Sequence, residues 1–155
     1  MTSITEHITQ AIVDRIAWCY GDVPIFTDEQ KEGCETPSFF VREIVNRTER
    51  LLGNRRQKSS TFNIEYFAED KPRRNIPANA DLQKAEEVLS NALETITDRE
   101  GNTYYGRDIT GTIADGVLQV QVSYDYFILL VQDKEPLMER LFQIQSTKED
   151  SAHGE

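Results

Sequence analysis

The feature that most constrains this chain is a pair of strands joined by a tight turn. Apolar and polar residues alternate from Val117 to Val131, and Asp115-Gly116 comes directly before them. Asp-Gly between two alternating runs is typical of a β-hairpin, because both residues tolerate the positive φ angles that the turn requires. The run from Tyr104 to Ala114 supplies the first strand. The second strand is predicted to present one apolar face, made of Leu118, Val120, Val122, Tyr124 and Tyr126.

Two helices are predicted, each with a single apolar stripe. Ser3 and Glu6 form a capping box that starts the first helix, which runs from Ile4 to Cys19. The second helix is expected from Ala80 to Ile96. The two stripes consist of Ile4, Ile8, Ala11, Ile12, Ile16 and Cys19, and of Leu82, Ala85, Leu89, Ala92, Leu93 and Ile96.

Three further strands complete the pattern. Val23 to Thr27 reads as a short strand, and Pro24 places it at a sheet edge because proline has no N–H to donate. Ser38 to Arg47 is rich in β-branched and aromatic residues, and Thr61 to Phe67 alternates in type. Burying all these faces together predicts an α+β fold, a mainly antiparallel sheet with two helices packed on one face.

The length of the chain fits one domain. The sequence has 155 residues, and a typical domain has about 100 to 150. We expect a single α+β domain over residues 1–145 and a mobile acidic tail over residues 146–155. Between the second hairpin and that tail, Pro136 to Ile144 is compatible with a short helix or a last strand.

Charge is distributed unevenly along the sequence. The net charge is −10, which would repel nucleic acid and anionic lipid if it were uniform. Residues 1–41 carry two basic and seven acidic side chains. Residues 75–155 carry six basic and fifteen acidic side chains. Residues 42–74 reverse the balance, with nine basic and five acidic side chains. This basic middle segment is the first indication of where a partner binds.

A search for catalytic chemistry gives little. His7 and His153 stand apart from any nucleophile, Cys19 and Cys34 have no metal-binding spacing, and no glycine-rich phosphate loop is present. Asp108, Asp115 and Asp125 could form a metal-dependent hydrolase site, but a turn and exposed strand positions explain them better. We expect no enzyme activity, no cofactor and no metal. No segment resembles a membrane span or a signal peptide, which indicates a cytosolic type of protein.

The basic residues gather at one predicted hairpin tip, from Glu49 to Lys58, with Lys71, Arg73 and Arg74 as a second patch. Such a tip could bind a nucleic-acid backbone or an acidic protein surface. Adjacent leucines at a solvated tip favour the protein contact, because they would otherwise expose apolar area without reason. The candidate interface residues are Arg50, Leu51, Leu52, Gly53, Asn54, Arg55, Arg56 and Lys58.

The order of these elements resembles a known family. Five elements carry the resemblance: the Phe39-Phe40-Val41 strand, the Leu51-Leu52-Gly53-Asn54-Arg55 tip, the strand ending in Tyr66-Phe67, the long helix and the Asp115-Gly116 hairpin. In this order they are similar to the phage tail terminator proteins of phages and phage-derived particles of Gram-positive bacteria. The resemblance covers the chain from the first helix to about Ile144. Its specificity lies in the order of the elements and in the Leu-Leu-Gly-Asn-Arg tip.

The resemblance implies a structural, non-enzymatic role. It implies a homo-oligomer, a hexameric ring that caps the tail tube, ends its polymerisation and joins the tail to a head-side connector or neck protein. The implied partners are the tail tube protein, a tail sheath protein if the tail is contractile, and genomic DNA passing through the lumen, with no membrane. The implied location is a virion or phage-tail-like particle assembled in the bacterial cytoplasm. The alternative is a nucleic-acid-binding accessory protein that uses the basic hairpin Arg50 to Lys58.

Overall fold

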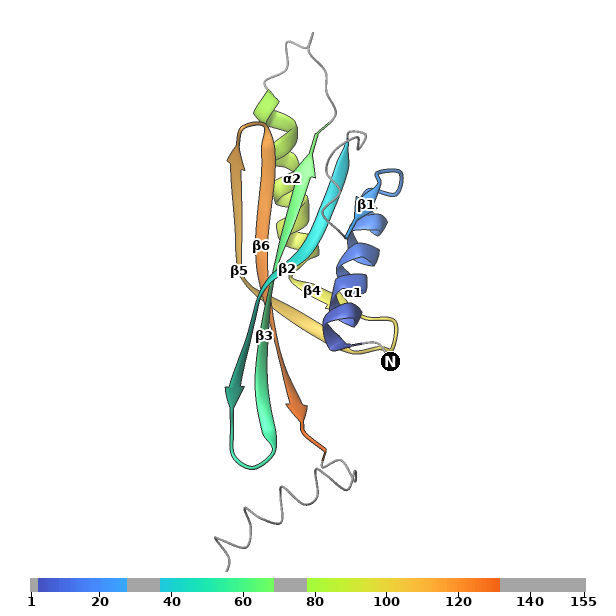
Figure 1. Cartoon of the computed structure of the whole chain (residues 1–155). Helices are drawn as coiled ribbons and strands as arrows, with labels where there is room; N and C mark the ends of the chain where they lie inside the picture. Colours follow the sequence, from blue (N-terminus) through green and yellow to red (C-terminus); the bar gives the residue numbers. More distant parts are fainter. Residues whose placement is uncertain (1–2, 28–36, 69–77, 132–155) are drawn as a thin grey trace, which may run out of the picture.

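The computed structural model describes residues 3–27, 37–68 and 78–131 (Figure 1). In chain order the elements are α1 (Ile4–Cys19), β1 (Ile25–Phe26), β2 (Ser38–Arg50), β3 (Arg55–Phe67), α2 (Ala78–Ala92), β4 (Thr95–Thr97), β5 (Thr103–Ala114) and β6 (Val117–Leu129). The predictions for Cys34, for the basic patch at residues 71–74 and for everything from residue 132 onward lie outside the described residues.

The strands form one twisted sheet with the order β1-β2-β3-β6-β5-β4. β1 runs parallel to β2, and all other pairs are antiparallel. β1 lies at the sheet edge, as Pro24 predicts, and the Pro24 carbonyl accepts a hydrogen bond from the Phe39 N–H at 2.9 Å. Both helices contribute to one core on one face of the sheet, so the predicted α+β class is confirmed (Figure 1).

The core is assembled from the predicted stripes and strand faces. The capping box at Ser3 and Glu6 is present, and it starts α1 at the predicted residue. The ends of the first stripe are less buried than expected, since Ile4 is exposed and Cys19 half-buried where the helix leaves the sheet. The largest fully buried side chains are Tyr124, Phe39, Phe62, Ile8, Ile12, Ile16, Ile64, Leu82, Leu89, Leu93, Ile96 and Leu118.

The β5–β6 hairpin forms where the sequence places it. Asp115 and Gly116 have φ angles of 54° and 75°, so both adopt the left-handed backbone that a two-residue hairpin turn needs. Ala114 pairs with Val117 directly across the turn. The prediction from Asp115-Gly116 is therefore confirmed at the level of backbone angles.

The predicted second helix is too long at its C-terminal end. α2 ends at Ala92, and the segment Thr95–Thr97 forms the short strand β4 beside β5. Leu93 and Ile96 are buried, so their spacing imitates a continuing helical stripe. The β-branched run Thr95-Ile96-Thr97 favours a strand instead, and the Gly106 N–H donates to the Glu94 carbonyl at 2.8 Å, which starts the pairing with β5.

The predicted long hairpin tip from Glu49 to Lys58 is also wrong in one respect. β2 continues to Arg50 and β3 begins at Arg55, so the turn itself contains only residues 51–54. Polar side chains made this segment look like a loop. The pairing of β3 with β6 continues as far as Arg55 opposite Leu129, and this third strand keeps the hairpin in regular β-structure.

Candidate assembly surface

Three strands extend past the helices as a projecting arm (Figure 1). We define the arm as residues 46–59 and 126–131, which are the distal parts of β2, β3 and β6 with the turn and the residues that follow β6. The remaining described residues form the body. Neither helix covers the sheet along the arm (Figure 1).

The tip of the arm is held by hydrogen bonds from its own predicted residues. The Leu51 N–H donates to the Arg55 carbonyl at 3.0 Å, and Gly53 takes a φ of 68° in the turn. The Arg56 guanidinium donates from Nη1 to the carbonyls of Gly53 and Arg55, at 3.3 and 2.8 Å. Arg56 is therefore partly occupied in stabilising the turn.

Asn54 ties this turn to the end of β6. Its Nδ2 donates to the Leu130 carbonyl at 2.8 Å, and the Leu130 N–H donates to the Asn54 carbonyl at 2.7 Å. These two hydrogen bonds hold Leu130 against the turn, beside the predicted interface.

Strand register divides the arm into two faces, because residues paired across antiparallel strands share a face. Arg50 pairs with Arg56 and Thr48 with Lys58, on the face that continues the helix-covered side. Lys58 Nζ donates to Thr48 Oγ1 at 2.7 Å. The arm face nearer the helices is therefore rich in cations, and we call it the cationic face.

The opposite face of the arm carries apolar side chains. Phe127 pairs with Gln57 and Leu129 with Arg55, so these four residues lie on one side of the arm. Phe127 is 68% exposed and Leu129 is 60% exposed, while Leu52 at the turn is 87% exposed. We call Phe127, Leu129 and Leu52 the apolar arm patch. Exposed apolar side chains grouped in this way are typical of protein interaction surfaces.

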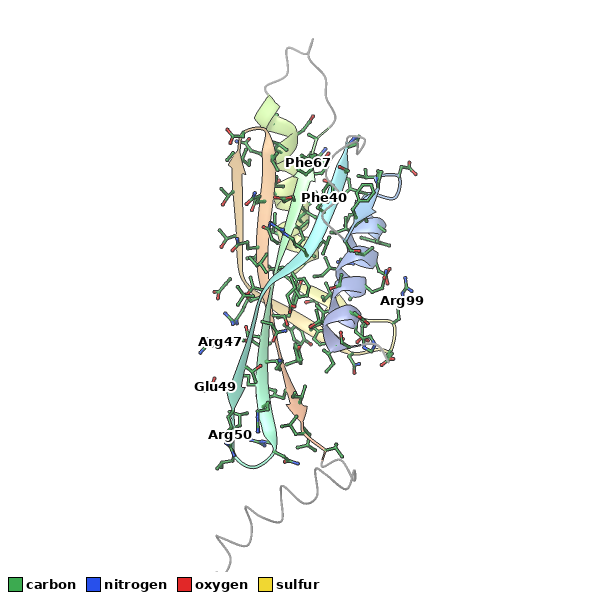
Figure 2. All side chains as sticks on the ribbon, in the orientation of Figure 1. Phe40, Arg47, Glu49, Arg50, Phe67 and Arg99 are labelled. Carbon is green, nitrogen blue, oxygen red and sulfur yellow. The ribbon has the colours of Figure 1, made fainter. Side chains whose placement is uncertain are left out.

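All eight predicted interface residues lie on this arm. Arg50, Leu52, Gly53, Asn54 and Arg55 are exposed. Leu51, Arg56 and Lys58 are half-buried, the last two in the contacts described above. Figure 2 shows Arg47, Glu49 and Arg50 along the same strand of the arm.

Sequence reasoning missed Phe127, Leu129, Leu130 and Val131, which are all exposed. The signal was present in the alternation of β6. Its outward positions are first polar, at Gln119, Gln121, Ser123 and Asp125, and then become apolar at Phe127, Leu129 and Val131. A change from polar to apolar side chains along one face of a strand indicates that the surroundings of that face change at this point.

Arg107 on β5 connects the base of the arm to the body. Arg107 donates from Nε and Nη2 to the two carboxylate oxygens of Asp125, at 2.7 and 3.1 Å, and from Nη2 to Ser59 Oγ at 2.8 Å. These Arg107 hydrogen bonds hold the pKa of Asp125 below its usual value, although burial opposes the shift. Asp108 also contacts Arg107, with a φ of 55° at the irregularity in β5. Asp108 and Asp125 thus each form an ion pair with Arg107.

A second polar cluster lies in the body. Asp98 accepts hydrogen bonds from the Glu100 and Asn102 N–H groups, the Asn102 side chain and the Tyr104 hydroxyl. Burial alone would raise the pKa of Asp98, but these donors together lower it.

His7 lies near this cluster, with Nδ1 3.9 Å from Asp98 Oδ2. It lines an open hollow of about 430 Å³ together with Glu6, Gln10, Arg99 and Glu100. Among the described residues no group of three or more His, Cys, Asp or Glu side chains is placed to hold a metal ion. No helix in the described part of the chain is long and apolar enough to cross a membrane.

Arm and body differ in charge. The arm carries five basic residues and one acidic residue, Glu49, for a net charge of +4. The described body carries five basic and fourteen acidic residues, for a net charge of −9. The basic middle segment of the sequence is thus a basic projection from an acidic body.

Comparison with known proteins identifies a family but no curated relative. No curated protein matches the sequence. A solved structure titled only by a sequence identifier is 12% identical, with 83% of this chain and 97% of that chain covered, at a TM-score of 0.42. The family model described as "Phage tail terminator protein" matches residues 7–136. Because this match covers most of the chain, the protein belongs to the phage tail terminator family, a structural family of the phage tail.

Proposed function

We propose that this protein forms a ring of six copies that caps the phage tail tube, ends its polymerisation and joins the tail to a head-side connector. The family membership supports a structural role in the tail. The observation that carries the proposal further is the apolar arm patch, which a lone subunit would leave in water.

The shape and charge of the subunit suit repeated head-to-tail contact. A head-to-tail interface uses two different surfaces, and it closes into a ring when the rotation between neighbours divides a full turn. A basic arm and an acidic body are two such surfaces on one chain. Their opposite charges orient each subunit before the apolar contacts form.

A ring that caps the end of a tube has two exposed faces, and each face meets a different neighbouring protein. One face of the ring meets the tail tube protein, with a tail sheath protein around it in a contractile tail, and the other face meets the connector. Genomic DNA passes through the lumen. The particle is a virion or a phage-tail-like particle assembled in the bacterial cytoplasm.

A tube-length assay tests the capping function. Tail tube protein of the same phage is polymerised with increasing amounts of this protein, and tube lengths are measured by electron microscopy. We expect shorter tubes as the ratio rises, and no shortening with the double variant Leu52→Asp/Phe127→Asp. Tubes of equal length at every ratio of wild-type protein would contradict the proposal.

A second candidate function, nucleic-acid binding, is favoured by the cationic face alone. Arg50, Arg56 and Lys58 lie on one side of the arm, where they could neutralise backbone phosphates. This candidate predicts binding of short duplex DNA that weakens steeply with salt and is reduced in Arg50→Gln/Lys58→Gln. Absence of binding at low salt removes it.

A further inference from the structure

The acidic body carries one exposed large aromatic side chain on its helices, Trp18 near the end of α1. It is 77% exposed, and the Arg15 guanidinium lies over its ring at 5.1 Å from the centroid. The core packing of α1 uses Ile8, Ala11, Ile12 and Ile16 and leaves Trp18 out. Tryptophan is enriched among the residues that dominate interface energies, and an exposed ring gains free energy when a partner covers it.

The surroundings of Trp18 complement the apolar side of the arm. Asp22 is exposed just after the helix, whereas Asp14, one turn before Trp18, is already paired with Arg99 at 3.0 Å. On the arm, Arg55 lies on the same face as Phe127 and Leu129 because it pairs directly with Leu129. Apolar side chains with a neighbouring cation can therefore meet an aromatic ring on an acidic body, with the exposed carboxylate of Asp22 four residues further along the chain.

We infer that Trp18 is the centre of the surface that receives the apolar arm patch of a second copy of this chain. The inference rests on the proposed ring and adds the identity of its two contacting surfaces. Phe127 and Leu129 of one subunit cover the Trp18 ring of the next, while Arg55 approaches Asp22. Arg15 holds the ring in place through its contact with the opposite side.

The chain provides its own reporter of this contact, because Trp18 is the only tryptophan in the sequence. Its fluorescence emission is expected to shift to shorter wavelength when the wild-type protein assembles in a concentration series. Trp18→Ala is expected to weaken association about 30-fold, the change typical of a residue that dominates an interface. Tyr105→Ala is the matched control, since Tyr105 is another body aromatic, 70% exposed, and should leave association unchanged.

Mixing two defective variants tests the pairing of the two surfaces. Phe127→Asp keeps Trp18 but loses the apolar arm patch, and Trp18→Glu keeps the arm but loses the receiving surface. Each alone is expected to be monomeric. Their mixture is expected to give a heterodimer without a ring, with a blue-shifted emission from the one Trp18 present.

The outcomes separate this inference from the proposed function. A ring that forms with unchanged Trp18 emission, or a Trp18→Glu variant that assembles as the wild type does, overturns the inference and leaves the ring standing. A weaker association of Tyr105→Ala than of Trp18→Ala also overturns it. A wild-type protein that forms no closed oligomer contradicts the proposed ring, whatever the emission of Trp18.

Discussion

The body and the arm are built from the same strands, yet their side chains meet different surroundings. Phe62 on β3 is fully buried in the body, whereas Phe127 on the neighbouring strand β6 is mostly exposed on the arm. Both strands keep their pairing through both regions. Phe62 faces the two helices, whereas Phe127 lies on the opposite face of the sheet, on the arm. Burial therefore depends on which face of the sheet a side chain takes and on whether a helix lies over that face.

The largest expected effect separates two phenylalanine residues. Phe62→Ala should lower the free energy of unfolding by about 3–5 kcal/mol, because it empties a packed site. Phe127→Ala should change it by less than about 0.5 kcal/mol, because the side chain is exposed in the single subunit. Chemical denaturation of each variant under conditions that keep it monomeric measures both values. A strong destabilisation by Phe127→Ala would show that the arm patch packs within its own subunit.

Two glycine residues give the next comparison. An alanine Cβ at Gly106 would lie 2.7 Å from the Leu93 carbonyl oxygen and 2.8 Å from Val122 Cγ2, so Gly106→Ala should cost about 3 kcal/mol. A Cβ added at Gly53 would meet no other atom within 4 Å, so only the φ of 68° opposes a side chain there. Gly53→Ala should therefore cost about 1 kcal/mol. Thermal unfolding of both variants tests this order, and equal costs would contradict it.

The smallest expected effect concerns two carboxylates and pH. Asp98→Asn should cost about 2 kcal/mol, since an amide cannot accept all the hydrogen bonds that the buried carboxylate accepts. Asp125→Asn should cost about 1 kcal/mol or less, because its partner Arg107 is partly exposed.

Both carboxylates have a lowered pKa in the folded protein, so their stabilisation is present above the unfolded value of about 3.9 and is lost as pH falls through the folded value. Between pH 5 and pH 3, the free energy of unfolding of the wild type should therefore fall more steeply than that of Asp98→Asn. Urea titrations across this range give the two slopes. Parallel slopes would show that Asp98 has the same pKa in the folded and unfolded chain.

The sequence was sufficient where a local signal had one physical meaning. Asp115-Gly116 predicted its turn because few residues accept two positive φ angles, and Ser3 with Glu6 predicted the start of α1. It failed at Thr95–Thr97, where buried residues at helical spacing belong to a helix end and a strand. Spacing alone cannot show which element buries a residue.

The candidate site was predicted in place but not in full. Leu52 and the basic residues drew attention to the tip, and the structure puts all of them on the arm. Phe127 and Leu129 share a face with Arg55 only through the pairing of β3 with β6, which brings together residues more than seventy positions apart. Long-range register of this kind does not follow from local sequence patterns.

Native mass spectrometry of the wild-type protein and of Leu52→Asp/Phe127→Asp across a concentration series tests the central claim most directly. We expect a discrete closed oligomer of six copies for the wild type. We expect a folded monomer for the variant, because the apolar arm patch would then carry charge. A variant that forms the same closed oligomer, or a wild type that stays monomeric at every concentration, would contradict the claim that the arm joins the subunits of a ring.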